Sequence, residues 1–142
     1  MTRVGFYIVE NDDADSRLRL ALRLTDKAHQ QGHRIFIHSE SEEEARTLDE
    51  RLWAFRPASF LPHALAPTEP DAQIVIGWGQ EPEAHDDLLI NLCTEVPRFI
   101  GRFHRVAELV NQEPHRLEAL RNSYRHYRER GYQLEEHRLA SV

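Results

Sequence analysis

Short apolar runs alternate along the chain with longer stretches in which apolar residues recur at helical spacing. The short runs at residues 4–9, 34–38, 74–77 and 88–92 are rich in β-branched, leucine and aromatic residues and predict strands. Residues 16–31 carry a broad face of leucines and stop at Gly32, which predicts a helix that packs against a sheet. A strand, a helix and a second strand at this spacing predict a parallel βαβ unit.

Two further segments of helical spacing lie on either side of the later strands. Ser39 and Glu42 have the spacing of a capping box, which predicts the start of a second helix over residues 42–53. Residues 99–110 predict a third helix, because their large apolar residues share one face, namely Phe99, Phe103, Val106 and Val110.

The last long element is a helix predicted over residues 114–130, with Pro114 in its first turn and Gly131 as its stop. The chain after Gly131 predicts a short extended piece, and we expect residues 133–142 to be partly frayed. Together the elements predict an α/β fold with a single domain over residues 1–142. We expect a mixed, mostly parallel sheet with helices on both faces.

Charge and cysteine content narrow the possible classes of function. The 142 residues carry a net charge of −6 at pH 7, which counts against a protein whose whole surface binds nucleic acid. From Arg98 onward, however, arginines outnumber acidic residues. No apolar run approaches the roughly 20 residues that span a bilayer, and Cys93 has no second cysteine to pair with. We therefore expect a cytoplasmic protein.

A sheet of this kind suggests a nucleotide site, but the sequence lacks both glycine-rich motifs that hold phosphates. Gly77-Trp78-Gly79 follows a predicted strand, and a tight turn explains it. The nine histidines are scattered, and a structural zinc site would need closely spaced cysteines. We expect a fold that resembles nucleotide-binding domains in shape only, with no cofactor, no metal and no catalytic residue.

An enzymatic alternative remains open at the end of the first predicted strand. Asp12, Asp13 and Asp15 follow it, and acid clusters in that place can bind Mg²⁺. Helix capping and solvation explain the same residues. The alternative function is a small nucleotide- or metal-dependent enzyme with a degenerate site.

The clearest chemical pattern is a row of arginines on the last predicted helix. Arg121, Arg125 and Arg128 recur at i, i+4 and i+7 and therefore lie on one side of the helix. An apolar strip borders them, made of Leu117, Leu120, Tyr124 and Tyr127. The row fits a solvated charged face, a groove for an acidic peptide with an apolar end, or a site for a phosphate backbone.

A second pattern is a cluster of aromatic residues where the helix over residues 42–53 ends. Trp53, Phe55 and Phe60 lie close together in sequence, beside Pro57 and Pro62, which prevent the helix from continuing. Aromatics in such a place either fill the core or anchor a protein–protein interface, and the sequence leaves both interpretations open.

Most of the chain resembles the chi subunit of bacterial DNA polymerase III. The motifs that carry the resemblance are FY at 6–7, LDERLW at 48–53, SFLPH at 59–63, LINL at 89–92 and YRHYRERGYQL at 124–134. The resemblance implies an α/β accessory subunit of the clamp-loader assembly, without catalysis of its own, that acts in DNA replication. It implies two protein partners, namely the psi subunit and the acidic C-terminal tail of single-stranded DNA-binding protein. In some relatives a helicase competes with psi. The overall charge disfavours direct contact with nucleic acid, which we expect to be weak or absent.

The resemblance also assigns residues to these partners. The tail, which ends in an apolar residue with a free carboxylate, would bind residues on or near the last predicted helix: Val110, Arg121, Tyr124, Arg125 and Arg128. Trp53 and Phe60 would contact psi. The chain departs from the family at Leu117, where a basic residue is expected, and Arg116 or His115 are candidates to replace it.

Overall fold

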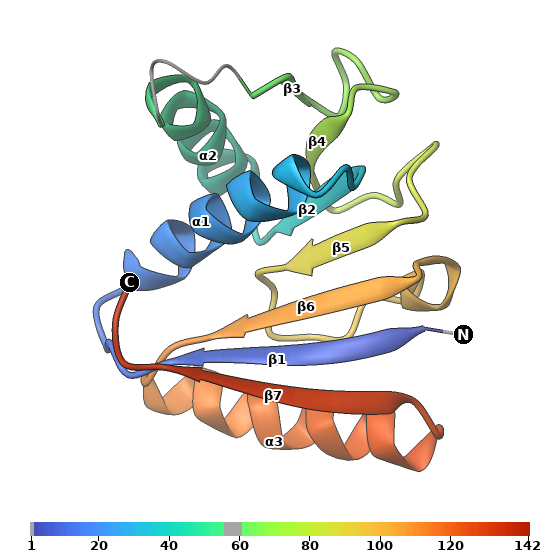
Figure 1. The fold of residues 1–142 in the computed structure, drawn as a ribbon. Helices are drawn as coiled ribbons and strands as arrows, with labels where there is room; N and C mark the ends of the chain where they lie inside the picture. The colour runs from blue at the N-terminus through green and yellow to red at the C-terminus, as the bar shows by residue number, and fades with distance from the viewer. Residues whose placement is uncertain (1, 56–60) are drawn as a thin grey trace.

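The computed structural model describes residues 2–55 and 61–142. One sheet forms its centre (Figure 1). The strands are β1 (Arg3–Val9), β2 (Ile35–Ser39), β3 (His63–Leu65), β4 (Ile74–Trp78), β5 (Leu88–Asn91), β6 (Arg105–Val110) and β7 (Gln133–Leu139). Their order across the sheet is β3-β4-β2-β5-β6-β1-β7, and every described pair is parallel rather than mixed. The predicted α/β fold is confirmed.

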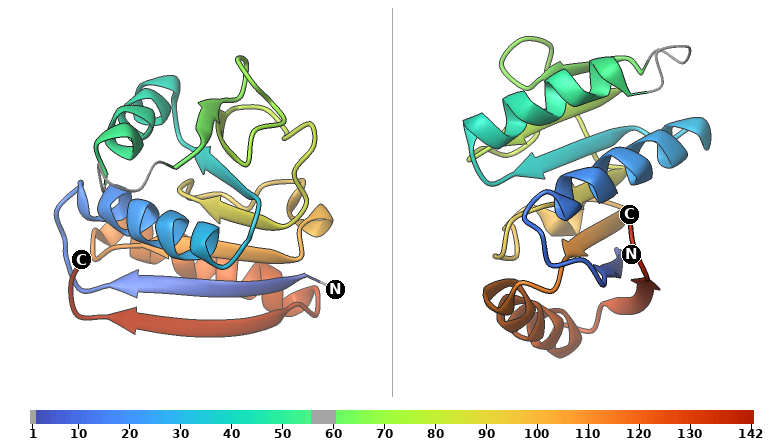
Figure 2. Two further views of the ribbon diagram at one scale, coloured as in Figure 1. Left: turned by 45° about the horizontal axis from the view of Figure 1, so that its top comes forward. Right: turned by 90° about the vertical axis from the view of Figure 1, so that its left-hand side faces the viewer.

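Helices cover both faces of the sheet. In the two views of Figure 2, α1 (Ser16–Gln30) and α2 (Glu42–Ala54) lie across the sheet from α3 (Pro114–Glu129). Leu20 and Leu48 are fully buried in the core on the side of α1 and α2. Tyr127 of α3 is fully buried in a second core on the opposite side. The three-layer arrangement follows from the apolar faces that the helical spacing predicts.

The alternation of side chains along β1 divides its residues between the two faces. Phe6 and Ile8 belong to the core beneath α3. Gly5 and Tyr7 line a hollow on the side of α1. Because successive residues of a strand point to opposite faces, β1 contributes to two different surfaces of the molecule.

The start of α2 differs from the predicted capping box. Ser41 is the N-cap, and its Oγ accepts a hydrogen bond of 3.1 Å from the N–H of Glu44. Glu44 in turn accepts a 3.1 Å bond from the N–H of Glu40 through Oε1. Ser39 is still part of β2, and its hydroxyl donates to the carbonyl oxygens of Ser41 and Gly77. The prediction of a cap at Ser39 was therefore wrong by two residues, since β2 extends through that position.

Residues 99–110 are not a helix. They form a 3₁₀ turn (Ile100–Arg102) followed by strand β6. Val106–Val110 are buried throughout, because β6 lies between β5 and β1 and is covered on both faces. A strand buried on both faces shows no alternation of polar and apolar residues, so its sequence is compatible with helical spacing.

The extended piece predicted after Gly131 is confirmed as a strand, within the stretch expected to be partly frayed. Gln133–Leu139 form β7, which pairs with β1 along all seven residues. Five of its seven residues are polar or charged, as is common in an edge strand. Its pairing with β1 places the predicted extended piece at the edge of the sheet.

Candidate functional site

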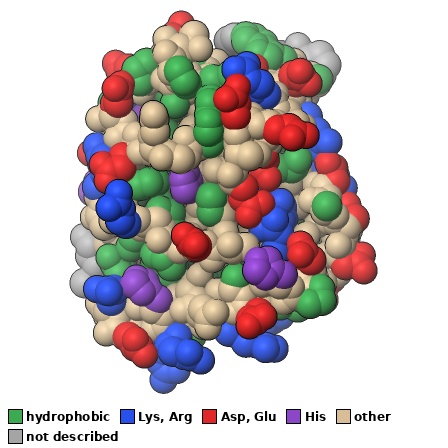
Figure 3. Space-filling model, turned by 180° about the vertical axis from the view of Figure 1, so that it is seen from behind, with side chains coloured by type: hydrophobic (Ala, Val, Ile, Leu, Met, Phe, Trp, Pro, Cys, Tyr) green, Lys and Arg blue, Asp and Glu red, His purple; other side chains and the backbone are tan. Residues whose placement is uncertain are grey.

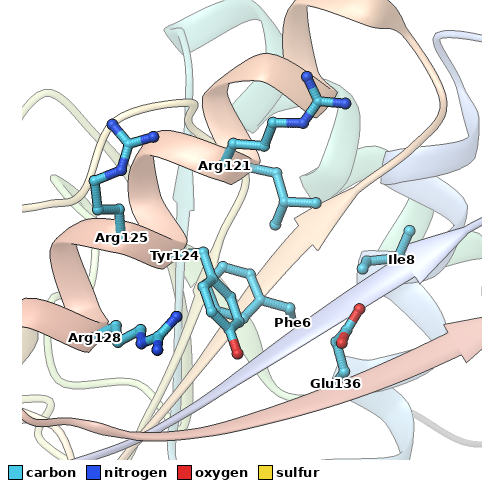
Figure 4. A pocket seen from close by; sticks show the side chains of 8 residues that line it. Phe6, Ile8, Arg121, Tyr124, Arg125, Arg128 and Glu136 are labelled. Carbon is cyan, nitrogen blue, oxygen red and sulfur yellow. The ribbon is translucent and has the colours of Figure 1, made fainter.

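A pocket of about 310 Å³ lies where α3 crosses β1 and β7 (Figure 4). Its volume is within the range of sites that hold small ligands or single side chains. Its lining combines apolar and basic side chains: Phe6, Ile8, Leu120, Arg121, Tyr124, Arg125, Arg128 and Glu136. The arginine row and apolar strip of α3 thus lie against residues of β1 and β7, two strands that are distant in sequence.

Aromatic contacts build the floor of this pocket. The ring of Phe6 lies 5.4 Å from that of Tyr124 and 5.9 Å from that of Tyr127, measured between ring centroids. Phe6 and Tyr127 are fully buried, whereas Tyr124 is 37% exposed. Tyr124 therefore offers a supported apolar surface to a ligand, and its position relative to Phe6 is fixed by the core.

The arginines of α3 make the pocket rim basic. Arg121, Arg125 and Arg128 are exposed and line the pocket (Figure 4). Within residues 2–55 and 61–142, none of the three forms an ion pair with an acidic side chain. Figure 3 shows basic side chains gathered along the lower edge of the molecule, where Figure 1 draws α3. Glu136 is the one carboxylate in the lining, and it is paired with Arg138 at 2.8 Å.

Val110, one of the residues expected in the tail site, lies beneath the pocket and not in its lining. It lies in β6 beside Ile8, is only 6% exposed, and does not line the pocket. Val110 belongs to the core beneath the pocket, because β6 is covered by α3. Phe6 and Ile8 line the pocket above it.

The residues expected to replace a basic side chain at Leu117 do not reach the pocket. Leu117 packs against the core beneath α3. The guanidinium of Arg116 pairs with Glu40 at 2.7 Å and with Glu113 at 3.1 Å. His115 is exposed and is not part of the lining. The basic rim therefore consists of the three arginines at positions 121, 125 and 128.

Trp53 forms the centre of a second candidate surface, on α2. It is 56% exposed, and together with Tyr124 it makes up the exposed large hydrophobic side chains of the described chain. Its ring lies 4.5 Å from the buried imidazole of His63, the first residue of β3. Both residues line a hollow of about 540 Å³ beside β3. Phe60, the other residue predicted for this surface, lies outside the described residues.

His63 is held in place from two sides. Its Nδ1 lies 2.7 Å from the carbonyl oxygen of Leu61, and its Nε2 lies 3.3 Å from a carboxylate oxygen of Asp49. The imidazole is therefore a fixed support beneath Trp53. A well-supported, exposed indole is typical of an interface anchor.

The acids after β1 form ion pairs rather than an open cluster. Asp13 pairs with Arg19 at 2.8 Å, and Asp15 pairs with Arg51 at 2.6 Å and with Arg19 at 3.1 Å. These arginine contacts hold the pKa of both carboxyls below its ordinary value. In the part of the chain that the structure describes, no group of three or more His, Cys, Asp or Glu side chains is arranged to bind a metal.

A hollow at the carboxyl ends of β2 and β5 contains the single cysteine. The Sγ of Cys93 lies 3.4 Å from Nδ1 of His38. Burial raises the pKa of the Cys93 thiol to about 12 and lowers the pKa of His38. The thiol is therefore protonated at neutral pH, and this pair lacks the thiolate that a cysteine nucleophile requires.

Comparison with known proteins gives a consistent set of relatives. The family model described as DNA polymerase III chi subunit, HolC, matches residues 1–135. The chain is 46% identical over 142 residues to the DNA polymerase III subunit chi of Pseudomonas aeruginosa, covering all of both chains. It is 33% identical over 141 residues to the subunit of the same name from Escherichia coli, covering 94% of this chain and 96% of that one.

Similarity to a solved structure concerns the fold alone. The crystal structure of T4 UvsW matches 99% of this chain with a TM-score of 0.69 at 6% sequence identity. The match covers 42% of that protein. Among the described residues, the helices are all too short or too polar to cross a membrane.

Proposed function

Because this chain belongs to the DNA polymerase III chi subunit family, and so to the accessory subunits of a replicative polymerase, we propose that it is a non-catalytic adaptor. In this proposal it works in the cytoplasm and binds two proteins. One is the psi subunit, through which it joins the clamp-loader assembly. The other is single-stranded DNA-binding protein, through its acidic C-terminal tail.

The pocket between α3 and β1 is the observation that carries the tail proposal. A tail that ends in an apolar residue with a free carboxylate needs an apolar recess with cations at its mouth. Phe6, Ile8 and Tyr124 supply the recess, and the arginine row supplies the cations. The rest of the acidic tail would meet Arg125 and Arg128 at longer range.

Within this pocket we assign the terminal carboxylate to Arg121. A guanidinium binds a carboxylate through two parallel N–H bonds, and such charge-assisted bonds are stronger than neutral ones. Arg125 and Arg128 follow Arg121 by one and two helical turns, so they would bind acidic residues that precede the terminus. Val110 would support the floor from below, beside Ile8.

The surface around Trp53 is our proposed site for psi. Trp53 is exposed and rests on His63, as expected of an anchor for a partner. We propose that Phe60 extends this surface, and that a competing helicase uses it as well. Trp53 lies beside β3 and the arginine row lies beside β7, which are the two edge strands of the sheet. The two proteins can therefore bind at the same time.

Calorimetric titration with tail peptides tests the proposal. A peptide with a free C-terminal carboxylate and an apolar last residue should bind in a saturable manner. Amidation of the C-terminus, or removal of the last residue, should each weaken binding by about tenfold or more. Equal affinity for all three peptides would show that the arginines act only as a diffuse positive surface.

A further inference from the structure

A second hollow, of about 280 Å³, lies on the face of the sheet opposite the tail pocket. It is bordered by β1, β6 and β7 and by the C-terminal end of α1. Arg3, Lys27 and Arg105 line it, and Glu135 is the one carboxylate in the lining. This hollow shares no lining residue with the tail pocket or with the hollow beside Trp53.

Two stacked rings stand beside the basic residues. Tyr7 and His137 are opposite each other in the pairing of β1 with β7, and their rings stack with centroids 4.4 Å apart and planes 10° apart. Gly5 makes room for this pair, since a Cβ there would lie 3.1 Å from Cε1 of Tyr7 and 3.6 Å from Cδ2 of His137. Both rings line the hollow, so an aromatic wall faces the cations.

The cations of this hollow are available to a ligand. In residues 2–55 and 61–142, neither Lys27 nor Arg105 forms an ion pair, and both are exposed. Arg3 contacts Glu135 at 3.5 Å, and this pair is exposed on both sides and therefore weak.

The end of α1 does not oppose an anionic ligand as strongly as a free helix end would. A helix C-terminus carries partial negative charge on its last carbonyl groups. Here the carbonyl oxygens of Lys27 and Ala28 accept hydrogen bonds from the N–H of Gln31, and that of His29 accepts one from Gly32. Lys27 adds a full positive charge at the same place.

We propose that this hollow binds single-stranded DNA, with a base against the ring of Tyr7 and the neighbouring phosphates on Lys27 and Arg105. Proteins that bind single strands without sequence preference combine these two elements, an aromatic surface for stacking and cations along the backbone. An acidic peptide would use the cations but would leave the aromatic wall without a role. The site lies on the opposite face of β1 from the tail pocket, because Tyr7 alternates with Phe6 and Ile8. DNA and the tail can therefore bind together.

Contacts between cations and phosphates should make binding sensitive to salt. Two to three phosphate contacts predict that affinity falls by about tenfold between about 50 and 200 mM salt. Fluorescence anisotropy with a labelled oligothymidine of about 12 nucleotides measures this. Lys27→Glu and Arg105→Glu should each weaken binding by about tenfold at the lower salt concentration.

Matched variants distinguish binding at this hollow from the effect of the protein's net charge. Arg46→Glu makes the same change in net charge on α2, where Arg46 pairs with the exposed Glu42, and should leave affinity within about twofold. Tyr7→Ala should weaken binding by about fivefold or more, whereas Tyr7→Phe keeps the ring and should match the wild type. Circular dichroism verifies that each variant is folded.

Several results would overturn the proposal. One is the absence of binding at low salt, and another is an equal loss in Arg46→Glu and Lys27→Glu. An abasic strand that binds as tightly as oligothymidine would rule out stacking on Tyr7. Displacement of the DNA by an acidic peptide of equal charge at equal concentration would assign the hollow to a protein ligand. Tail-peptide affinity should be unchanged in Lys27→Glu, so this test is independent of the tail proposal.

Discussion

The hydroxyl of Tyr127 donates a 2.6 Å hydrogen bond to Oε2 of Glu108, and both side chains are buried between α3 and the sheet. Asn91 donates a second bond, of 2.8 Å, from Nδ2 to Oε1 of Glu108. The carboxyl thereby connects α3 to β6 and β5. Tyr127 also contacts Phe6 in the floor of the tail pocket. This network helps to fix the helix on which the proposed tail site depends.

Glu108 should make stability depend on pH. Burial raises its pKa from an ordinary 4.5 to about 7, although the bonds from Tyr127 and Asn91 oppose the rise. The folded protein therefore binds this proton more tightly than the unfolded chain. The resulting stabilisation is complete below about pH 4.5 and is lost as the pH rises through about 7. It amounts to at most about 3 kcal/mol, which urea unfolding at pH 5 and pH 7.5 would measure.

The Glu108→Gln variant isolates this contribution. Its amide can accept from Asn91 and donate to the hydroxyl oxygen of Tyr127, but it does not titrate. The lowered pKa values of His38 and His85 act in the opposite direction, since their contribution is lost as the pH falls below about 6.5. These histidines remain in the variant, so the difference between the two proteins belongs to Glu108. An identical pH profile for both proteins would contradict the assignment.

A side chain at Gly77 should destabilise the fold. A Cβ at this position in β4 would lie 2.5 Å from Cζ of Phe36, whose ring is buried in the sheet's second core. We expect Gly77→Ala to lower the free energy of unfolding by about 1–3 kcal/mol. Gly32→Ala serves as a comparison that tests backbone strain without a clash, because Gly32 has a positive φ of 88° and open space around it. Wild-type stability of Gly77→Ala in urea would show that the Phe36 ring moves freely.

Trp53 should matter for binding and little for folding. Trp53→Ala removes an exposed ring, so the melting temperature should stay close to that of the wild type. The affinity for psi should fall by at least about 2 kcal/mol, as for a central interface aromatic. The adjacent Leu52 is 2% exposed, and Leu52→Ala should lower stability by about 2–5 kcal/mol. If Trp53→Ala unfolds the domain, or if it binds psi normally, Trp53 is not the anchor.

The sequence predicted the elements whose pattern is local. The cap at Gly32 and the proline at the start of α3 mark helix ends through the conformation of one or two residues. The row of Arg121, Arg125 and Arg128 follows from helical spacing alone, and the structure places all three at one pocket. Only the motif resemblance assigned partners to that row and to Trp53.

The missed features depend on contacts between distant parts of the chain. Strand β6 has apolar residues on both faces, so their spacing also fits a helix. Only its position between β5 and β1 identifies it as a strand. The extended piece at β7 was predicted, but its pairing with β1 was not. The roles of Ile8 and Glu136 in the pocket were not predicted, because the sequence does not show which face of β1 and β7 lies under α3. The available signal was strand alternation, which places Phe6 and Ile8 on one face of β1.

The affinity of the tail peptide for Arg121→Ala tests the central claim most directly. Loss of one charge-assisted bond to the terminal carboxylate should weaken binding by about tenfold or more at low salt. Arg130→Ala is the matched control, because Arg130 ends the same helix and does not line the pocket. Anisotropy at two salt concentrations should show wild-type affinity for Arg130→Ala and a loss for Arg121→Ala that persists at high salt. Equal affinity in wild type and Arg121→Ala would mean that the arginine row is only a solvated helix face.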